Sequence, residues 1–172
     1  MTLVAGSLSS PSATASIDWT NVNAGTSLTA TSGGALTLAS VSTGTTGAGG
    51  DQTIHATGAV DLTTTNAAAG TIGVVSDAST VTLGSATSGG TQTIVANGAL
   101  KYTTLQASAG DIDLTSEAAS IAGLSPSDTL DAHGSFDLGA ATTISATSLK
   151  AKTGKGTVTA GGAINLQTTN VA

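Results

Sequence analysis

A short unit that recurs along the chain restricts the possible folds more than any other feature of the sequence. Each copy has a Gly, a usually small residue, and then an apolar, a variable and a second apolar residue; the copies begin at Gly34, Gly58, Gly70, Gly98, Gly110, Gly134 and Gly162. Alternating apolar residues are the pattern of a β-strand with one buried face. The leading Gly suits a tight corner, because a positive φ angle costs glycine little. The sequence therefore predicts many short strands that each begin at a corner.

A longer repeat indicates how these strands are arranged. Residues 52–78 align with residues 92–118 at an offset of 40, and about half of the aligned positions are identical, as is typical of a repeat array. No segment keeps apolar residues at helical spacing for three turns, so we expect no substantial helix.

The spacing of large apolar residues predicts the length of one coil. Residues Ile54, Ile72, Ile94, Ile112 and Leu130 follow one another at intervals of 18 to 22 residues. A coil of about 20 residues has room for two or three strands, each paired with its equivalent ~4.8 Å along the axis. We therefore predict an all-β fold, a parallel β-helix (β-solenoid) of roughly seven coils. The same spacing predicts that these apolar residues form one dry interior column.

The composition fits a narrow core that repeats along an axis. Of the 172 residues, 39% are hydrophobic, 8% are charged and 2% are aromatic, and the net charge is −6. Roughly 30% are Ser or Thr, well above ordinary usage. Disordered chains combine low hydrophobicity with high net charge, which this chain does not. The acidic balance argues against nucleic-acid binding, no apolar run reaches the ~18 residues of a membrane span, and the absence of Cys excludes disulfides.

The ends of the chain differ from its middle. Residues 1–26 lack the Gly-led unit and contain Pro11 and Trp19, so we expect an N-terminal capping or partly disordered segment, followed by the solenoid over residues 27–172. The stretch Gly123–Asp128 (GLSPSD) holds the second proline and predicts a surface excursion. Because no polar cap follows the last unit, we interpret the chain as a fragment of a longer array.

The repeats resemble a known family. The pattern G-A-[LVI]-x-[LY], with T-T-N or A-S-x-G at the turns, is similar to the haemagglutinin-type repeats of filamentous haemagglutinin and related exoproteins of bacterial two-partner secretion; the strongest matches are Gly58–Asn66, Gly98–Leu114 and Gly162–Asn170. The resemblance implies a right-handed β-helix. It also implies export across the outer membrane through a transporter and use as a long shaft at the cell surface. The family's secretion domain carries Asn-Pro signatures. This sequence has no Asn-Pro, so the resemblance places it in the shaft and not in the secretion domain.

Few residues are candidates for chemistry. The only histidines, His55 and His133, each lie shortly before a Gly-led unit, and several predicted coils separate them. We therefore expect no metal pair. The Lys150, Lys152 and Lys155 group is interpreted as a solvated face.

Three acidic residues fall within one predicted coil: Asp111, Asp113 and Glu117. Asp111 and Asp113 alternate with an isoleucine and could lie ~6 to 7 Å apart on one face. Glycoside hydrolysis requires two carboxylates at a defined separation. A sugar site also needs aromatic and basic partners, and the only nearby candidates are Tyr102 and Lys101.

Two further patterns point to binding. Residues Gly47–Asp51 resemble one copy of a calcium-binding nonapeptide, but the motif occurs in tandem where it binds calcium. The pairs Thr29-x-Thr31 and Thr157-x-Thr159 resemble the Thr ladders of ice-binding solenoids, although they are irregularly spaced.

Taken together, we expect no catalytic, cofactor-binding or metal site and no enzyme activity. The sequence and the resemblance predict a structural shaft segment of a secreted bacterial surface exoprotein. It would serve adhesion or contact-dependent growth inhibition, with a surface receptor or polysaccharide of a host or neighbouring cell as partner. Two alternatives stay open: a polysaccharide-binding or polysaccharide-processing β-helix, and an ice-binding β-solenoid.

Overall fold

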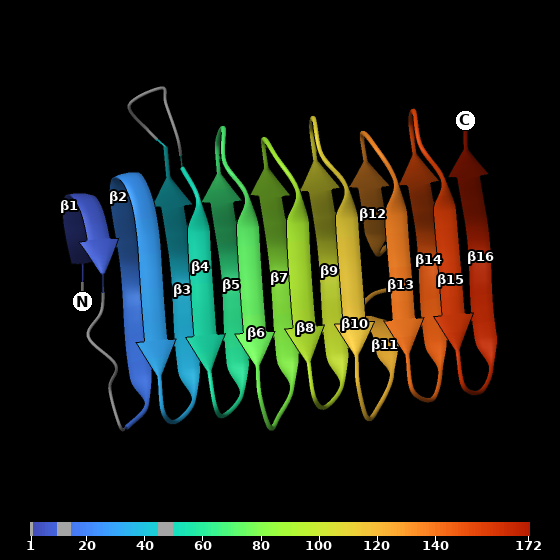
Figure 1. Ribbon diagram of the computed structural model, residues 1–172, viewed down its shortest axis with the longest axis horizontal. Coiled ribbons are helices and arrows are strands. Elements are labelled where there is room, and N and C mark those ends of the chain that lie inside the picture. Colours follow the sequence, from blue (N-terminus) through green and yellow to red (C-terminus); the bar gives the residue numbers. More distant parts are fainter. Residues whose placement is uncertain (1, 10–14, 45–49) are drawn as a thin grey trace.

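The chain forms a parallel β-solenoid in a computed structural model that describes residues 2–9, 15–44 and 50–172. It has about eight turns of roughly 20 residues, and the described residues contain no helix. In Figure 1 the front strands run downward, the rear strands run upward, and the chain advances from the N-terminus to the C-terminus. This is the path of a right-handed coil, so the predicted fold class is confirmed.

Each coil contributes one long and one short strand. The long strands have eight residues and are β3 (Leu36–Thr43), β5 (Val60–Ala67), β7 (Val81–Ser88), β9 (Leu100–Ala107), β14 (Ile144–Ala151) and β16 (Ile164–Val171). Strand β1 (Thr2–Ser9) also has eight residues, but it crosses from a long-strand position into a short-strand position. The five-residue strands are β4 (Gln52–Ala56), β6 (Ile72–Ser76), β8 (Gln92–Ala96), β10 (Ile112–Ser116), β13 (Phe136–Ala140) and β15 (Gly156–Ala160). The sixteen-residue β2 (Ile17–Ser32) spans both kinds, and β11 (Ile121–Gly123) and β12 (Thr129–Ala132) are one long strand divided by an excursion.

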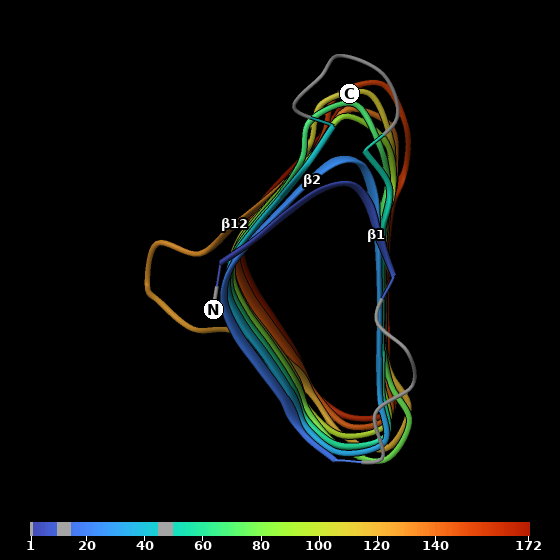
Figure 2. The same ribbon diagram turned by 90° about the vertical axis from the view of Figure 1, so that its left-hand side faces the viewer.

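The long strands bend at their centre. In the pairing of β5 with β7, Leu62 faces Leu83 and Thr64 faces Ser85, while Thr63 between them has no ladder partner. Because the ladder is interrupted there, the chain turns a corner within the strand. The end-on view in Figure 2 therefore has a three-sided outline.

The interior contains several parallel columns where the sequence predicted one. Ile54 and Ile94 do lie in one column, with Val74 between them. Ile72 and Ile112 instead lie two residues earlier along their strands, in the column of Gln92. The predicted single column is therefore wrong. The coil has about 20 residues, and the intervals of 18 and 22 residues between the isoleucines arise because some of them lie two positions earlier on their strands. A shift of two residues keeps a side chain on the same face of a strand.

Leu130, the last member of the predicted column, belongs to the other ladder. It lies in β12, between Leu105 of β9 and Leu149 of β14. All three side chains are at most 1% exposed. The prediction that Leu130 is buried is thus confirmed, while its assignment to one column with the four isoleucines is wrong.

Two glutamines in the interior explain the 40-residue repeat. Gln52 and Gln92 are buried two coils apart, with Ile72 between them. The Nε2 of Gln52 donates to Asn66 O at 2.9 Å, and the Nε2 of Gln92 donates to Gln106 O at 2.8 Å. The buried NH2 group of each side chain thus finds a backbone carbonyl, which removes part of the cost of burying it, although Gln92 Oε1 has no partner among the described residues. The unit that repeats in the sequence is therefore a pair of coils.

The Gly at the head of each unit is needed for close stacking of coils. Among the described residues, positive φ occurs only at Gly44 and Gly50, neither of which leads a unit. A Cβ at Gly110 would overlap the backbone of Gly90 and Thr91 in the preceding coil. The expectation that the leading glycines serve positive φ angles is therefore wrong, because the requirement comes from the neighbouring coil.

The parallel ladder begins before residue 27. Strand β2 starts at Ile17 and pairs with β3 from there, and β1 pairs with β2. The boundary expected after residue 26 thus does not separate two kinds of fold among the described residues. The excursion predicted at Gly123–Asp128 does protrude, between β11 and β12 (Figure 2).

Candidate functional site

The outward face of the short strands holds both Thr-x-Thr pairs. One outward column runs Thr29, Thr53, Gly73, Thr93, Asp113, Asp137 and Thr157, and its neighbour runs Thr31, His55, Val75, Val95, Thr115, Gly139 and Thr159. The two pairs therefore lie on one face, at opposite ends of the solenoid. Gly, Val and carboxylate side chains interrupt the Thr ladder between them.

The long strands carry a more regular polar column that sequence reasoning missed. It consists of Ser40, Thr64, Ser85, Thr104, Thr129, Ser148 and Thr168, a hydroxyl in seven successive coils. In each uninterrupted long strand this is the fifth residue. The signal was present in the sequence, but coils of unequal length and the excursion before Thr129 obscure it.

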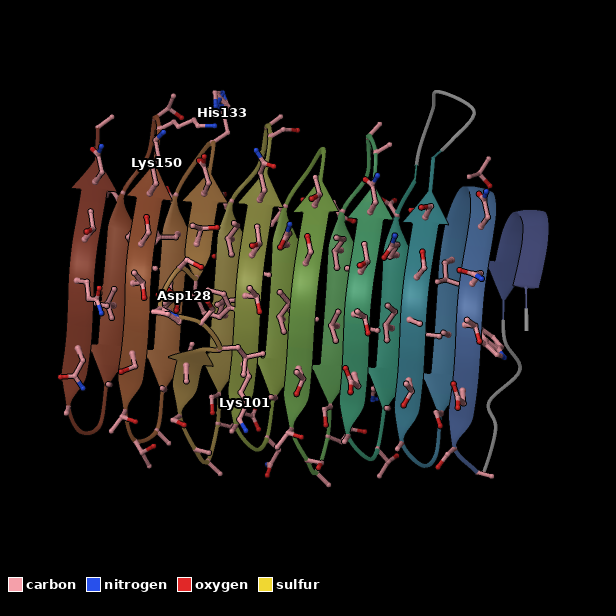
Figure 3. All side chains as sticks on the ribbon, turned by 180° about the vertical axis from the view of Figure 1, so that it is seen from behind. Lys101, Asp128, His133 and Lys150 are labelled. Atoms are coloured by element: carbon pink, nitrogen blue, oxygen red, sulfur yellow. The ribbon has the colours of Figure 1, made fainter. Side chains whose placement is uncertain are left out.

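The two histidines lie in different structural settings. His55 is in the middle of β4, and its Nε2 lies 2.8 Å from Asp77 Oδ2, with both side chains about half exposed. His133 is in the turn after β12, at the upper edge of the view in Figure 3. Although each histidine precedes a Gly-led unit in the sequence, the two do not occupy equivalent positions of the coil.

The acidic residues of the β10 coil do not converge on one point. Asp111 lies before β10, where its Oδ1 accepts the backbone N–H of Ser135 at 2.6 Å. Asp113 points outward from β10 and faces Asp137 in the next coil, whereas Glu117 lies past the end of β10. Partial burial raises the pKa of the Asp113 carboxyl, and the negative charges of Asp111 and Asp137 raise it further. Tyr102 is fully buried inside the solenoid, so no aromatic ring accompanies these carboxylates.

The lysine group is dispersed over the last coils. Lys150 projects from β14, Lys152 lies just after it, and Lys155 precedes β15. Lys152 Nζ lies 3.3 Å from Asp131 Oδ1. A shallow groove of about 240 Å³ crosses the long strands here, lined by Gln106, Asp131 and Lys150 among others. The three lysines are thus exposed, and Lys152 lies beside the partly buried carboxylate of Asp131.

A larger hollow lies between the excursion and the corner of β14 and β16. Its volume is about 600 Å³, and Leu124, Ser125, Asp128, Ser145, Asn165 and Gln167 are among the residues that line it. Most of the excursion is exposed, but Asp128 is only 2% exposed. Figure 3 places Asp128 at the base of the excursion, on the face of the long strands. Sequence reasoning identified the excursion without its buried carboxylate.

The geometry of the excursion explains why Asp128 is buried. A Cβ at Gly123 would overlap the Asp128 carboxylate, so this carboxylate occupies the space of the missing side chain. Its Oδ1 accepts the backbone N–H of Thr147 at 2.6 Å. The ladder neighbour of Gly123 in the preceding coil is Tyr102. The carboxylate therefore lies beside a buried tyrosine.

Tyr102 has a hydroxyl group that finds no hydrogen-bond partner among the described residues. Its side chain is fully buried, and burial together with the negative charge of Asp128 raises its pKa well above the ordinary value of 10.0. The hydroxyl is therefore a neutral donor and acceptor at physiological pH. An unpaired buried hydroxyl is uncommon in folded proteins.

The described residues contain neither a metal-ligand cluster nor a helix that could span a membrane. No three or more His, Asp or Glu side chains within them are grouped as ligands for a metal ion. None of their segments forms a helix long and apolar enough to cross a membrane. The stretch Gly47–Asp51, which resembles one copy of a calcium-binding nonapeptide, lies largely outside the described residues, because 45–49 are not among them.

Comparison with known proteins returned no relatives: no family model, no curated protein and no solved structure matches the chain.

Proposed function

We propose that this chain is a structural shaft segment of a large secreted bacterial surface exoprotein, which serves adhesion or cell-contact delivery without catalysis. The observation that carries the proposal is the pair of parallel ladders that connects each coil to the next along the described residues. Every added coil lengthens such a rod by ~4.8 Å, and its stability grows with each interface between coils. A shaft needs these two properties.

The outward positions also support a shaft. They hold mostly Ser, Thr, Asn and Gly, with few charges, and the exposed large hydrophobic side chains among the described residues are Leu124, Ile164 and Val171. Because each inner strand is paired on both sides and the outward side chains are mostly polar, the sides of the solenoid offer little surface for self-association. The similarity of the repeats to those of filamentous haemagglutinin adds the expectation of export and of a location at the cell surface.

Attachment to cells tests the adhesive role. Beads coated with the folded chain are incubated with bacterial and host cells, and beads coated with the Ile94→Asp variant serve as a misfolded control. The folded chain is expected to hold more cells under flow than the control. Equal retention by both kinds of bead contradicts adhesion by this segment.

Export and the competing functions need separate assays. Joined to the secretion domain of a two-partner system, the chain should reach the cell surface only when the matching transporter is present. Turnover of a polysaccharide that Asp113→Asn abolishes would show an enzyme, and inhibition of ice recrystallisation would show an ice-binding protein. Either result replaces the shaft proposal.

A further inference from the structure

The hollow beside the excursion contains a single charged side chain. Among its lining residues, Asp128 carries the only charge, and Ser125, Ser145, Asn165 and Gln167 contribute neutral hydroxyl and amide groups. The volume of about 600 Å³ falls within the ~300 to 1,000 Å³ of ordinary ligand pockets. The hollow thus has the size of a ligand site and an unbalanced negative charge.

Only one of the two carboxylate oxygens of Asp128 accepts a hydrogen bond that holds the excursion in place. Oδ1 accepts the N–H of Thr147, whereas Oδ2 accepts no hydrogen bond and joins no ion pair with any described residue. A carboxylate that is 98% buried is costly unless donors or an opposite charge compensate for the lost water. The unpaired hydroxyl of Tyr102 lies beside it. At this point the Tyr102 hydroxyl is therefore the buried polar atom that lacks a partner among the described residues.

We propose that this hollow binds a primary alkylammonium group, with Asp128 as its ionic partner. An ammonium group has three N–H donors and no acceptor. It can give one hydrogen bond to Asp128 Oδ2 and the others to side-chain oxygens of the lining, such as those of Ser125 and Asn165. The alkyl stem lies against Leu124 and Ile164, which are 48% and 45% exposed. A neutral sugar would use the same polar groups but would leave the carboxylate without an opposite charge.

The site is additional to the proposed shaft role, and neither depends on the other. Its natural ligand is either a free polyamine or a lysine side chain of another protein, since both present the same chemical group. Two probes separate these sources: cadaverine, and Nα-acetyl-lysine methylamide. Pentanol and maltotriose are the uncharged comparison probes.

The experiment is a calorimetric titration of the whole chain at pH 7 with each probe. At least one ammonium probe is expected to bind. Asp128→Asn should weaken it about ten- to hundredfold, the usual value of a hydrogen bond to a charged group. The asparagine oxygen can still accept the N–H of Thr147, so this variant should remain folded. Asp137→Asn removes a carboxylate from the short strands and should leave binding unchanged.

A second variant removes the excursion and fills the space beside Tyr102 that the Asp128 carboxylate would leave empty. The preceding coil has one residue, Thr103, between the two halves of its long strand. Replacing Gly123–Asp128 by Leu and Thr copies that corner, because Leu is also the residue of this inward column at position 83. This variant should abolish binding while circular dichroism stays unchanged. The proposal is overturned if no ammonium probe binds, if either variant binds as tightly as the natural chain, or if pentanol or maltotriose binds equally well.

Discussion

Individual inward residues gain their stability from neighbours on both sides. Ile94 is fully buried, between Val74 and Leu114 in adjacent coils. We expect Ile94→Ala to lower the free energy of unfolding by about 2 to 5 kcal/mol. The outward residues Asp61 and Lys101 are exposed, so their replacement by Thr should change it by about 0.5 kcal/mol or less. Urea midpoints of the three variants decide whether inward and outward positions are assigned correctly; equal losses would show a wrong register.

At the same scale, the carboxylates of Asp113 and Asp137 stack in adjacent coils. The pKa of Asp113 is raised from its ordinary value of 3.8, so the folded state holds this proton more tightly than the unfolded state. The bound proton stabilises the folded state fully at pH values below the ordinary pKa. This stabilisation is lost as pH rises through the raised pKa of the folded state. Asp113→Asn should therefore raise the urea midpoint at pH 7, and this gain should shrink toward pH 3.

The control for that pH dependence is Asp61→Asn. The ladder neighbours of Asp61 are Thr37 and Thr82, which carry no charge, so the midpoint at pH 7 should stay close to that of the natural chain. Asp137→Asn should act in the same direction as Asp113→Asn. A lower midpoint for Asp113→Asn at pH 7 would mean that Asp113 makes a favourable interaction.

At the scale of the element, the corners depend on glycine because coils stack there at short range. A Cβ at Gly110 would meet backbone of the preceding coil, whereas a Cβ at Gly139 in β13 would meet nothing within 4 Å. We expect Gly110→Ala to cost about 1 to 3 kcal/mol, as overpacking usually does. Gly139→Ala should be neutral or stabilise by up to about 1 kcal/mol, because Ala restricts the unfolded chain. Thermal unfolding of the two variants compares them directly, and a similar loss for both would contradict the stacking explanation.

At the scale of the whole molecule, burial decreases from the centre of the solenoid toward its last coil. Ile144 and Ile164 are neighbours in one inward column, yet Ile144 is fully buried and Ile164 is 45% exposed. We expect Ile144→Ala to cost about 2 to 5 kcal/mol and Ile164→Ala about half of that or less, since the transfer energy follows the buried area. Urea midpoints followed with hydrogen exchange measure both losses, because a solenoid can open from one end. Equal losses would show that the last coil is covered in solution.

The sequence by itself determined the class of fold and the length of the coil. Alternating apolar residues behind a Gly specify strands, and their recurrence specifies an array, because both signals are local and repeat. The excursion was also predictable, since Pro126 and its polar neighbours interrupt the pattern. The register was not, because a shift of two residues leaves every side chain on the same face. The intervals between isoleucines therefore could not distinguish adjacent columns.

Only the tertiary structure decided the remaining features. The need for glycine at the corners arises from the backbone of the preceding coil, which is about 20 residues away in sequence. The burial of Asp128 requires the missing side chain of Gly123 and the N–H of Thr147, which three different segments bring together. A stacked repeat places each residue against others one coil away. Local patterns therefore determine the strands, while contacts between coils determine the columns, the corners and the hollow that contains Asp128.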